Sequence, residues 1–282
     1  MSAPKVVASD LDGTVVRSDG TFSDRTRTAI AAVEAAGASF VMVTGRPVRW
    51  MHAIAQQTGH RGLAVCANGA LLYDLHTEEV VRSWLLSAAA GHDVVRALRE
   101  ALPGIAFAVE RLHLGFAHEP AYRPRWDSTD PITQGPVEQL LSDDVVKLLA
   151  RHEELSSDEL LAAARSAVPE GAELTHSSSD GLLEISAVGV SKASGLATVC
   201  AELSVDAADV VAFGDMPNDL PMLAWAGRGV AVANAHPEVL AAADEVAPGG
   251  SLLFRYPTDD DPCILVRDAA GRLDAFSQVC TH

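Results

Sequence analysis

Several classes of protein are excluded by what this chain has little of. Its four cysteines, Cys66, Cys200, Cys263 and Cys280, show no C-x-x-C spacing, which favours reduced thiols over disulfides or a zinc site. It has 21 basic residues against 38 acidic ones, and its net charge of -17 argues against broad binding to nucleic acid or to an anionic membrane. An anionic ligand must therefore meet a local positive charge.

Membrane spans and targeting segments are also lacking. No apolar run approaches the roughly 20 residues that cross a bilayer, and residues 1–5 carry one cation and lead straight into a strand pattern rather than a signal peptide. We therefore predict a cytoplasmic protein with no membrane partner. Aromatic residues make up only 5% of the chain and hydrophobic residues 48%, a balance that is typical of helices packed against buried strands.

The hydrophobic pattern predicts an α/β fold. Short β-branched runs at residues 6–8, 40–43, 63–65, 210–213 and 230–232 alternate with longer helical patterns, and each run is a candidate for a buried parallel strand. A helix is expected from about residue 24 to 36, capped by Ser23 or Asp24 and ended by Gly37. The strand–helix–strand unit that results predicts a Rossmann-like, doubly wound parallel sheet.

Residues 84–185 interrupt this alternation. Helical patterns near residues 93–101 and 157–168 flank a segment at residues 117–136 that contains Pro, Arg and His. We predict an inserted α+β cap domain over residues 84–185, so that the core is built from two segments, residues 1–83 and 186–250. A helix expected over residues 191–203 marks the return to the core pattern.

Polar side chains collect where the predicted parallel strands end, which is the edge at which open α/β sheets form their active sites. The residues concerned are Asp10, Asp12, Thr44, Gly45, Arg46, Asn68, Asp215, Asn218 and Asp219. Two carboxylates two residues apart and followed by Gly13 can both face one pocket if the loop turns after the first. One can then attack a phosphorus atom while the other moves protons.

A group of carboxylates would repel a phosphate unless positive charge offsets it. Mg²⁺ is a hard cation suited to carboxylate, water and phosphate oxygens, so we expect it to be held by Asp10, Asp215 and Asp219. Lys192 stands at the start of a predicted helix, where the macrodipole is also positive, and is expected to pin the transferred phosphoryl group.

Four segments resemble, in order, the motifs of the haloacid dehalogenase (HAD) superfamily, and within it the Cof-type phosphatases of subfamily IIB, which carry a large cap between the second and third motifs. The segments are residues 10–14 (DLDGT), 43–47 (VTGRP), 190–192 (VSK) and 214–219 (GDMPND). Residues 66–70 (CANGA) and 230–235 (VAVANA) are similar to further stretches of that group. The resemblance spans nearly all of the first 235 residues.

This resemblance implies hydrolysis of phosphomonoesters of small metabolites, such as sugar phosphates, through an aspartyl-phosphate with Mg²⁺ as cofactor. It implies that Asp10 is the nucleophile, Asp12 the general acid and base, and Lys192 the residue that neutralises the phosphoryl group. Phosphate binding is assigned to Thr44, Gly45, Arg46 and Asn218. Metal binding is assigned to Asp10, the Asp12 backbone carbonyl, Asp215 and Asp219.

Other interpretations stay open. One is a phosphosugar mutase of similar fold, and another, in a different class, is a non-catalytic phosphate-binding protein or an electron-transfer protein. Asp10 and Asp12 can also form a plain solvated turn, Lys192 can be an exposed helix residue, and Asp219 can be only a helix-start residue. The sequence does not indicate an oligomeric state.

The final segment, residues 251–282, departs from the core pattern. Cys280-Thr281-His282 resembles one ligand pair of a Rieske [2Fe-2S] protein, but such a cluster needs two Cys and two His, and no second pair follows. We therefore expect no cluster from this chain alone. A short β appendage is favoured, with strands near residues 264–266 and 273–276 and a turn at residues 269–271.

Overall fold

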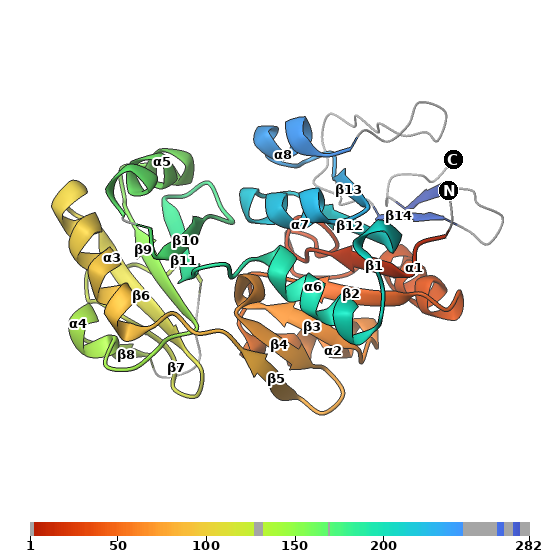
Figure 1. The fold of residues 1–282 in the computed structure, drawn as a ribbon, viewed down its shortest axis with the longest axis horizontal. Helices are drawn as coiled ribbons and strands as arrows, with labels where there is room; N and C mark the ends of the chain where they lie inside the picture. The colour runs from red at the N-terminus through yellow and green to blue at the C-terminus, as the bar shows by residue number, and fades with distance from the viewer. Residues whose placement is uncertain (1–2, 127–131, 169, 245–263, 268–272, 277–282) are drawn as a thin grey trace. The chain divides into compact units, whose positions relative to one another are not determined.

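Two distant stretches of the chain build one β-sheet in this computed structural model, which describes residues 3–126, 132–168, 170–244, 264–267 and 273–276. The strand order is β13-β12-β1-β2-β3-β4-β5 (Figure 1). These strands are β1 (Val6–Ser9), β2 (Ser39–Val43), β3 (Leu63–Cys66), β4 (Leu71–Asp74), β5 (Glu79–Ser83), β12 (Val210–Gly214) and β13 (Arg228–Ala231). Strands β13, β12, β1, β2 and β3 run parallel, whereas β4 is antiparallel to β3.

Strand β1 lies in the middle of the parallel part of this sheet. Val6 pairs with Val210 on one side and with Ser39 on the other, and all four residues of β1 are buried. Strands that are covered on both faces have continuous apolar runs rather than alternating ones. For this reason, short apolar runs in the sequence predict the positions of these parallel strands. The predicted Rossmann-like α/β fold is confirmed.

Helices of this first unit connect the strands. They are α1 (Asp24–Ala35), η1 (Val48–Trp50), α2 (Met51–Thr58), η2 (Ala67–Gly69), α6 (Lys192–Glu202), η3 (Ala207–Asp209), η4 (Pro217–Asp219), α7 (Leu220–Trp225) and α8 (Pro237–Ala242). Helix α1 begins after Ser23, whose hydroxyl accepts a hydrogen bond from the N–H of Thr26 at 2.9 Å, and Gly37 follows its end at a φ of 82°. Helix α6 packs against β2 and β3 (Figure 1).

A second unit comprises Ser83–Ser191, and the first comprises Met1–Arg82 and Lys192–His282. The sheet of the second unit has the order β10-β11-β9-β6-β7-β8. Its strands are β6 (Ala106–Arg111), β7 (Gly115–His118), β8 (Thr133–Gln134), β9 (Lys147–Arg151), β10 (Ala172–Thr175) and β11 (Leu182–Ala187). The pairs are antiparallel except for β7 with β8. Strand β11 lies between β10 and β9 in this sheet.

Three helices of the second unit, α3 (Ala88–Ala101), α4 (Val137–Leu140) and α5 (Ser157–Ala167), share a core with its sheet (Figure 1). Phe107 and Leu148 are buried in this core among side chains from α3 and α5. A capping box fixes the start of α5, since Ser156 and Glu159 each accept a hydrogen bond from the backbone N–H of the other. The unit therefore combines an antiparallel sheet with helices, in an α+β arrangement.

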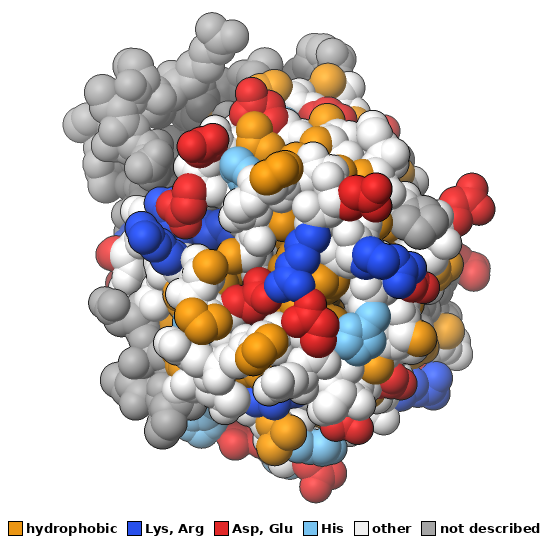
Figure 2. All heavy atoms as spheres, turned by 90° about the vertical axis from the view of Figure 1, so that its left-hand side faces the viewer, with side chains coloured by type: hydrophobic (Ala, Val, Ile, Leu, Met, Phe, Trp, Pro, Cys, Tyr) orange, Lys and Arg blue, Asp and Glu red, His pale blue; other side chains and the backbone are white. Residues whose placement is uncertain are grey.

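The surface and the helix lengths bear on possible partners. On the face drawn in Figure 2, basic side chains of the described residues lie beside acidic ones and form no continuous positive area. Throughout the described ranges, each helix is too short or too polar to cross a membrane. The absence of a nucleic-acid partner stays a prediction.

The final segment contains an antiparallel pair of strands, β14 (Ile264–Arg267) and β15 (Leu273–Phe276). Ile264 pairs with Phe276 and Arg267 with Leu273. These strands lie where the sequence predicts them, and the turn predicted at residues 269–271 lies outside the described residues. Cys280 and His282, the residues that resemble a Rieske ligand pair, lie outside the described residues.

Candidate active site

The candidate active site lies where strands of the first sheet end. Asp10 directly follows β1, Thr44 follows β2 and Asp215 follows β12. Lys192 begins α6, and Asp219 ends η4. Because the carboxyl ends of neighbouring parallel strands meet at one edge of a sheet, the fold brings these residues together, and all of them belong to the first unit.

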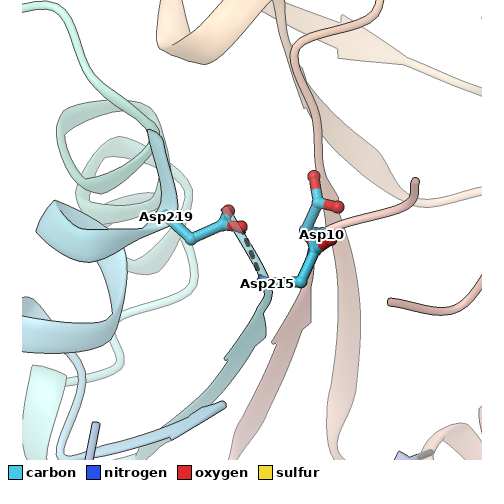
Figure 3. Close-up of side chains that lie close together, drawn as sticks. All are labelled: Asp10, Asp215 and Asp219. Atoms are coloured by element: carbon cyan, nitrogen blue, oxygen red, sulfur yellow. Dashed lines mark hydrogen bonds between the residues drawn. The ribbon is translucent and has the colours of Figure 1, made fainter. Parts of the chain in front are cut away.

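Three buried carboxylates form a carboxylate cluster that consists of Asp10, Asp215 and Asp219 (Figure 3). One oxygen atom from each residue lies within 4.8 Å of the others, and the three residues are 5%, 6% and 0% exposed. Carboxylate oxygens are the hard donors that Mg²⁺ prefers. The chemistry and spacing of these donors therefore fit a divalent cation.

Lys192 places one positive charge against the carboxylate cluster. Its Nζ donates to Oδ1 of Asp10 at 2.5 Å and to Oδ1 of Asp219 at 2.6 Å, and the residue is 1% exposed. Burial alone would lower the pKa of Lys192, but the charges of the two carboxylates outweigh burial and raise the pKa above its usual value. Lys192 therefore stays protonated at neutral pH.

Lys192 does not fully offset the repulsion among the three carboxylates of the cluster. Burial raises the pKa of Asp10 well above its usual value; Lys192 opposes this rise, and Asp219 and Asp215 add to it. Burial, followed by the charge of Asp219, likewise raises the pKa of Asp215 to about 7. Three carboxylates facing one ammonium group favour the binding of a further cation.

Hydrogen bonds from the backbone hold Asp219 in place. Its Oδ2 accepts from the N–H groups of Asp215 at 2.9 Å and Met216 at 3.0 Å, while its Oδ1 accepts from Lys192. Figure 3 shows the bond between Asp219 and the Asp215 backbone. Both oxygens of Asp219 therefore have donors already, so this residue organises the cluster from within.

The turn after Asp10 brings backbone and side chains close to Asp215. Thr14 donates its hydroxyl to Asp215 Oδ1 at 3.2 Å. Gly13 has a φ of 78°, and a Cβ atom at this position would lie 2.2 Å from Asp215 Oδ2. The side-chain amide of Asn234 donates to the carbonyl of Gly13 at 2.9 Å. Thr14 and Asn234 are not among the predicted site residues, although both are polar residues inside the segments that resemble the HAD superfamily.

The side chain of Asp12 pairs with Arg46 and lies outside the carboxylate cluster. Arg46 Nε donates to Oδ2 of Asp12 at 2.7 Å, and Arg46 Nη2 donates to Oδ1 at 2.5 Å. Burial would lower the pKa of Arg46, but the hydrogen bond and charge of Asp12 outweigh it and raise the pKa. Arg46, a residue predicted to bind phosphate, thus donates two hydrogen bonds to Asp12, the predicted general acid.

The other residues predicted to bind phosphate lie beyond the ends of β2 and β12, and they are Thr44, Gly45 and Asn218. Thr44 is fully buried, and its hydroxyl accepts a hydrogen bond from the N–H of Arg46 at 3.0 Å. Gly45 lies between these two residues in the loop after β2. Asn218 is buried in η4 and donates its Nδ2 to Oδ1 of Asn68 at 3.1 Å. Asn68 follows β3, so the strand-end rule that identified the other polar residues also points to it.

Comparison with known proteins identifies the family. The family described as haloacid dehalogenase-like hydrolase matches residues 7–249. The chain belongs to this family. The predicted membership of the HAD superfamily and the predicted enzyme class, a HAD-type hydrolase, are thereby confirmed.

Individual relatives cover most of the chain. YxeH of Bacillus subtilis (strain 168) is 28% identical over 254 residues, which cover 85% of this chain and 91% of YxeH. The 5-amino-6-(5-phospho-D-ribitylamino)uracil phosphatase YitU of the same organism is 30% identical over 82% of this chain and 87% of its own length. The pyridoxal phosphate phosphatase YbhA of Escherichia coli (strain K12) is 27% identical over 86% of this chain and 92% of its own length.

Solved structures share the fold. The phosphatase BT1666 from Bacteroides thetaiotaomicron has a TM-score of 0.70 and 24% identity, with coverage of 86% of this chain and 88% of that one. The HAD subclass IIB sugar phosphatase BT4131 has a TM-score of 0.71 and 20% identity, with coverage of 85% and 92%. The family match ends at residue 249, so the resemblance of the final segment to a Rieske protein finds no support.

Proposed function

We propose that this HAD family member is a Mg²⁺-dependent phosphatase that hydrolyses phosphomonoesters of small metabolites, with sugar phosphates as the first candidates. The observation that carries this proposal is the position of Lys192 between Asp10 and Asp219, with Asp215 completing the buried carboxylate cluster. This arrangement unites a candidate nucleophile, a cation site and a phosphate clamp at one edge of the sheet.

In the proposed reaction, a carboxylate oxygen of Asp10 attacks phosphorus, and the ester oxygen leaves with a proton from Asp12. Asp12 then takes a proton from water, whose oxygen attacks the phosphorus of the aspartyl-phosphate. This second displacement releases inorganic phosphate and restores the Asp10 carboxylate. Lys192 and Thr44 hold the phosphoryl oxygens, and the proton that Asp12 takes from water leaves Asp12 protonated for the next substrate.

The residues that would hold Mg²⁺ are Asp10, Asp215 and the backbone carbonyl of Asp12. Asp219 supports them, because its two oxygens already accept hydrogen bonds from Lys192 and from two backbone N–H groups. When bound, the cation offsets the charge of the carboxylates and polarises a phosphoryl oxygen. This division of roles places the ligands on the two strand ends β1 and β12 and their support on η4.

The substrate class and the roles of the two units belong to the same proposal. YitU and YbhA are named as phosphatases of small phosphorylated metabolites, and BT4131 is described as a sugar phosphatase. Residues 1–83 and 186–250 would supply the catalytic core, and residues 84–185 would form the cap that selects the leaving group. We place this activity in the cytoplasm, where such metabolites occur.

The proposal is tested by phosphate release from p-nitrophenyl phosphate in Mg²⁺ and in EDTA, with Asp10→Asn as the decisive variant. Asp24→Asn is the matched control, because the side chain of Asp24 is 94% exposed on α1. We expect turnover that requires Mg²⁺, that persists in Asp24→Asn and that falls by at least about 1,000-fold in Asp10→Asn, since losing a nucleophile removes the covalent route. Unchanged turnover in Asp10→Asn would sink the proposed nucleophile.

The same preparations separate the alternative functions. Isomer formation from a sugar phosphate without net phosphate release would identify a mutase, and phosphate binding without turnover of any substrate would identify a binding protein. Bound iron and visible absorption would indicate electron transfer. A panel of phosphorylated metabolites, compared by kcat/KM, then identifies the substrate class.

A further inference from the structure

Two buried carboxamides meet beside the candidate active site. Asn68 lies in η2, after β3, and Asn218 lies in η4, after β12. Asn218 Nδ2 donates to Asn68 Oδ1 at 3.1 Å, and the two residues are 5% and 3% exposed. Helix α6, which begins at Lys192, packs against both η2 and η4. This carboxamide pair, Asn68 with Asn218, therefore joins two loops that flank the proposed phosphate clamp.

One donor and one acceptor of the carboxamide pair are left over. Asn68 Nδ2 and Asn218 Oδ1 are buried and have no hydrogen-bond partner among the described residues. Buried polar atoms nearly always have hydrogen-bond partners, because without one the free energy lost by removing the atom from water is not recovered. A phosphate monoester matches what is left, since its oxygens accept hydrogen bonds and its monoanion carries one hydroxyl.

The backbone of η2 is held in an uncommon conformation at Ala67 and Asn68. Asn68 has φ 58° and ψ 29°, and Ala67 before it has a φ of 51°. Left-handed backbone is uncommon for residues other than glycine, although asparagine tolerates it best. Backbone hydrogen bonds maintain it, since Ala67 N donates to Arg46 O at 2.9 Å and Asn68 N donates to Thr44 O at 3.0 Å. The loop of Asn68 is thus tied to the loop that carries Thr44.

Close packing leaves little freedom for this loop to move away from α6. A Cβ atom on Gly195 of α6 would lie 2.4 Å from Val65 Cγ1 and 3.1 Å from the Cα of Gly69, the residue after Asn68. The absence of a side chain at Gly195 therefore lets α6 approach the end of β3. This approach keeps η2 and the start of α6 in fixed relation within the first unit.

We propose that Asn68 is a further phosphoryl-binding residue, which donates from Nδ2 to a phosphoryl oxygen while its Oδ1 holds the carboxamide of Asn218 in position. This inference rests on the proposed phosphatase function and adds a donor from the β3 side of the site. Thr44, Lys192 and Asn68 would then approach the phosphoryl group from three different elements.

Two substitutions separate the two parts of this role. Asn68→Asp keeps an oxygen that can accept from Asn218 but removes the Nδ2 donor and adds a negative charge. Asn68→Gly removes the whole carboxamide and suits the left-handed backbone. Ser204→Gly is the matched control, because Ser204 is an exposed residue with a φ of 56° beyond the end of α6.

The experiment measures the dissociation constant of inorganic phosphate by calorimetry in Mg²⁺, together with kcat, KM and the melting temperature. We expect Asn68→Gly to weaken phosphate binding by about 10- to 100-fold, as for loss of a hydrogen bond to a charged group. Asn68→Asp should weaken phosphate binding at least as much, while Ser204→Gly should leave it unchanged. A purely structural role would lower the melting temperature without this selective effect on phosphate binding.

The outcomes are distinguishable from failure of the proposed function. If the wild-type protein binds phosphate but hydrolyses no ester, the phosphatase proposal fails, and the ratio of phosphate affinities still decides the role of Asn68. Equal phosphate affinity of the wild-type protein and Asn68→Asp overturns the donor role, whatever the turnover. A wild-type protein that does not bind phosphate at all overturns the inference as well.

Discussion

Replacing Lys192 should destabilise the protein strongly, because its ammonium group donates to two carboxylates of the cluster. Lys192→Met keeps a side chain of similar length and so leaves little cavity, but it removes the ammonium group from Asp10 and Asp219. Breaking a buried ion pair by removing one partner destabilises a protein by about 3–5 kcal/mol, because the other charge stays buried and unpaired. Since a domain is typically stable by about 5–15 kcal/mol, the loss should be a large fraction of the total.

The measurement is urea unfolding followed by circular dichroism, in EDTA and again in Mg²⁺. Lys5→Met is the matched control, because Lys5 also pairs with an aspartate, Asp209 at 2.8 Å, but its side chain is 62% exposed. We expect Lys5→Met to leave the unfolding midpoint unchanged and Lys192→Met to lower it strongly in EDTA. Mg²⁺ should restore part of the stability of Lys192→Met, since a cation at the cluster offsets the same carboxylates, without restoring activity.

Equal unfolding midpoints for Lys192→Met and Lys5→Met in EDTA would refute the reasoning. That result would mean that the buried carboxylates tolerate the loss of the ammonium group by taking up protons at no measurable cost. A loss of stability in Lys192→Met that Mg²⁺ does not reduce at all would instead contradict the assignment of the cluster as a cation site.

Three further predictions follow from local geometry. Gly13→Ala should lower the melting temperature more than Gly20→Ala. Both glycines have left-handed φ values, but a Cβ atom at Gly13 would clash with the Asp215 carboxylate, whereas a Cβ atom at Gly20 would have open space. Equal losses would show that the Asp215 side chain moves away at little cost. Arg46→Gln should lower kcat/KM by about 10- to 100-fold for alkyl phosphates and much less for p-nitrophenyl phosphate. The reason is that Arg46 orients Asp12, the proposed proton donor, whereas a nitrophenolate leaves without a proton. Equal losses on both substrates would indicate that Arg46 binds phosphate instead. Burial lowers the pKa of His60 below its usual value of about 6.5, so the unfolded state binds more protons than the folded state. The free energy of unfolding should therefore fall as the pH drops below about 6.5. Urea titrations at a series of pH values should show a smaller decline in His60→Gln.

The parallel strands and the position of the candidate site at their ends could be predicted because both follow from local patterns. Strand β1 is buried throughout, so its apolar run is unambiguous, and Asp10 follows it directly. In contrast, all residues of β5 (Glu79–Ser83) are exposed, so no hydrophobic pattern marks that strand. Strand β9 begins with Lys147 and ends with Arg151, which are only 5% and 6% exposed. These charged residues interrupt the apolar pattern that would predict a buried strand, because their burial depends on partners elsewhere in the fold.

Pairings between distant side chains were the part of the site that the sequence could not supply. Arg46 was assigned to phosphate because it follows Thr44-Gly45, but its contact with Asp12 depends on how two loops 34 residues apart approach each other. The contact of Asn68 with Asn218 joins loops 150 residues apart. Strand-end position predicts that such residues share an edge, whereas their hydrogen-bond partners follow only from the three-dimensional arrangement.

The contrast between the carboxylate cluster and Asp12 is what the proposed chemistry requires. Asp219 is fixed by two backbone donors and Lys192, and Asp215 by the Thr14 hydroxyl, so the charges that would bind a cation and a phosphoryl group are oriented before either arrives. Asp12 is held by the half-buried guanidinium of Arg46, and the side chain of Asp12 is 56% exposed. A group that gives a proton in one step and takes one in the next must change its partners between the steps, which a fully buried network would prevent. The same edge of the sheet thus combines a buried group of oriented charges with one exposed carboxylate, that of Asp12.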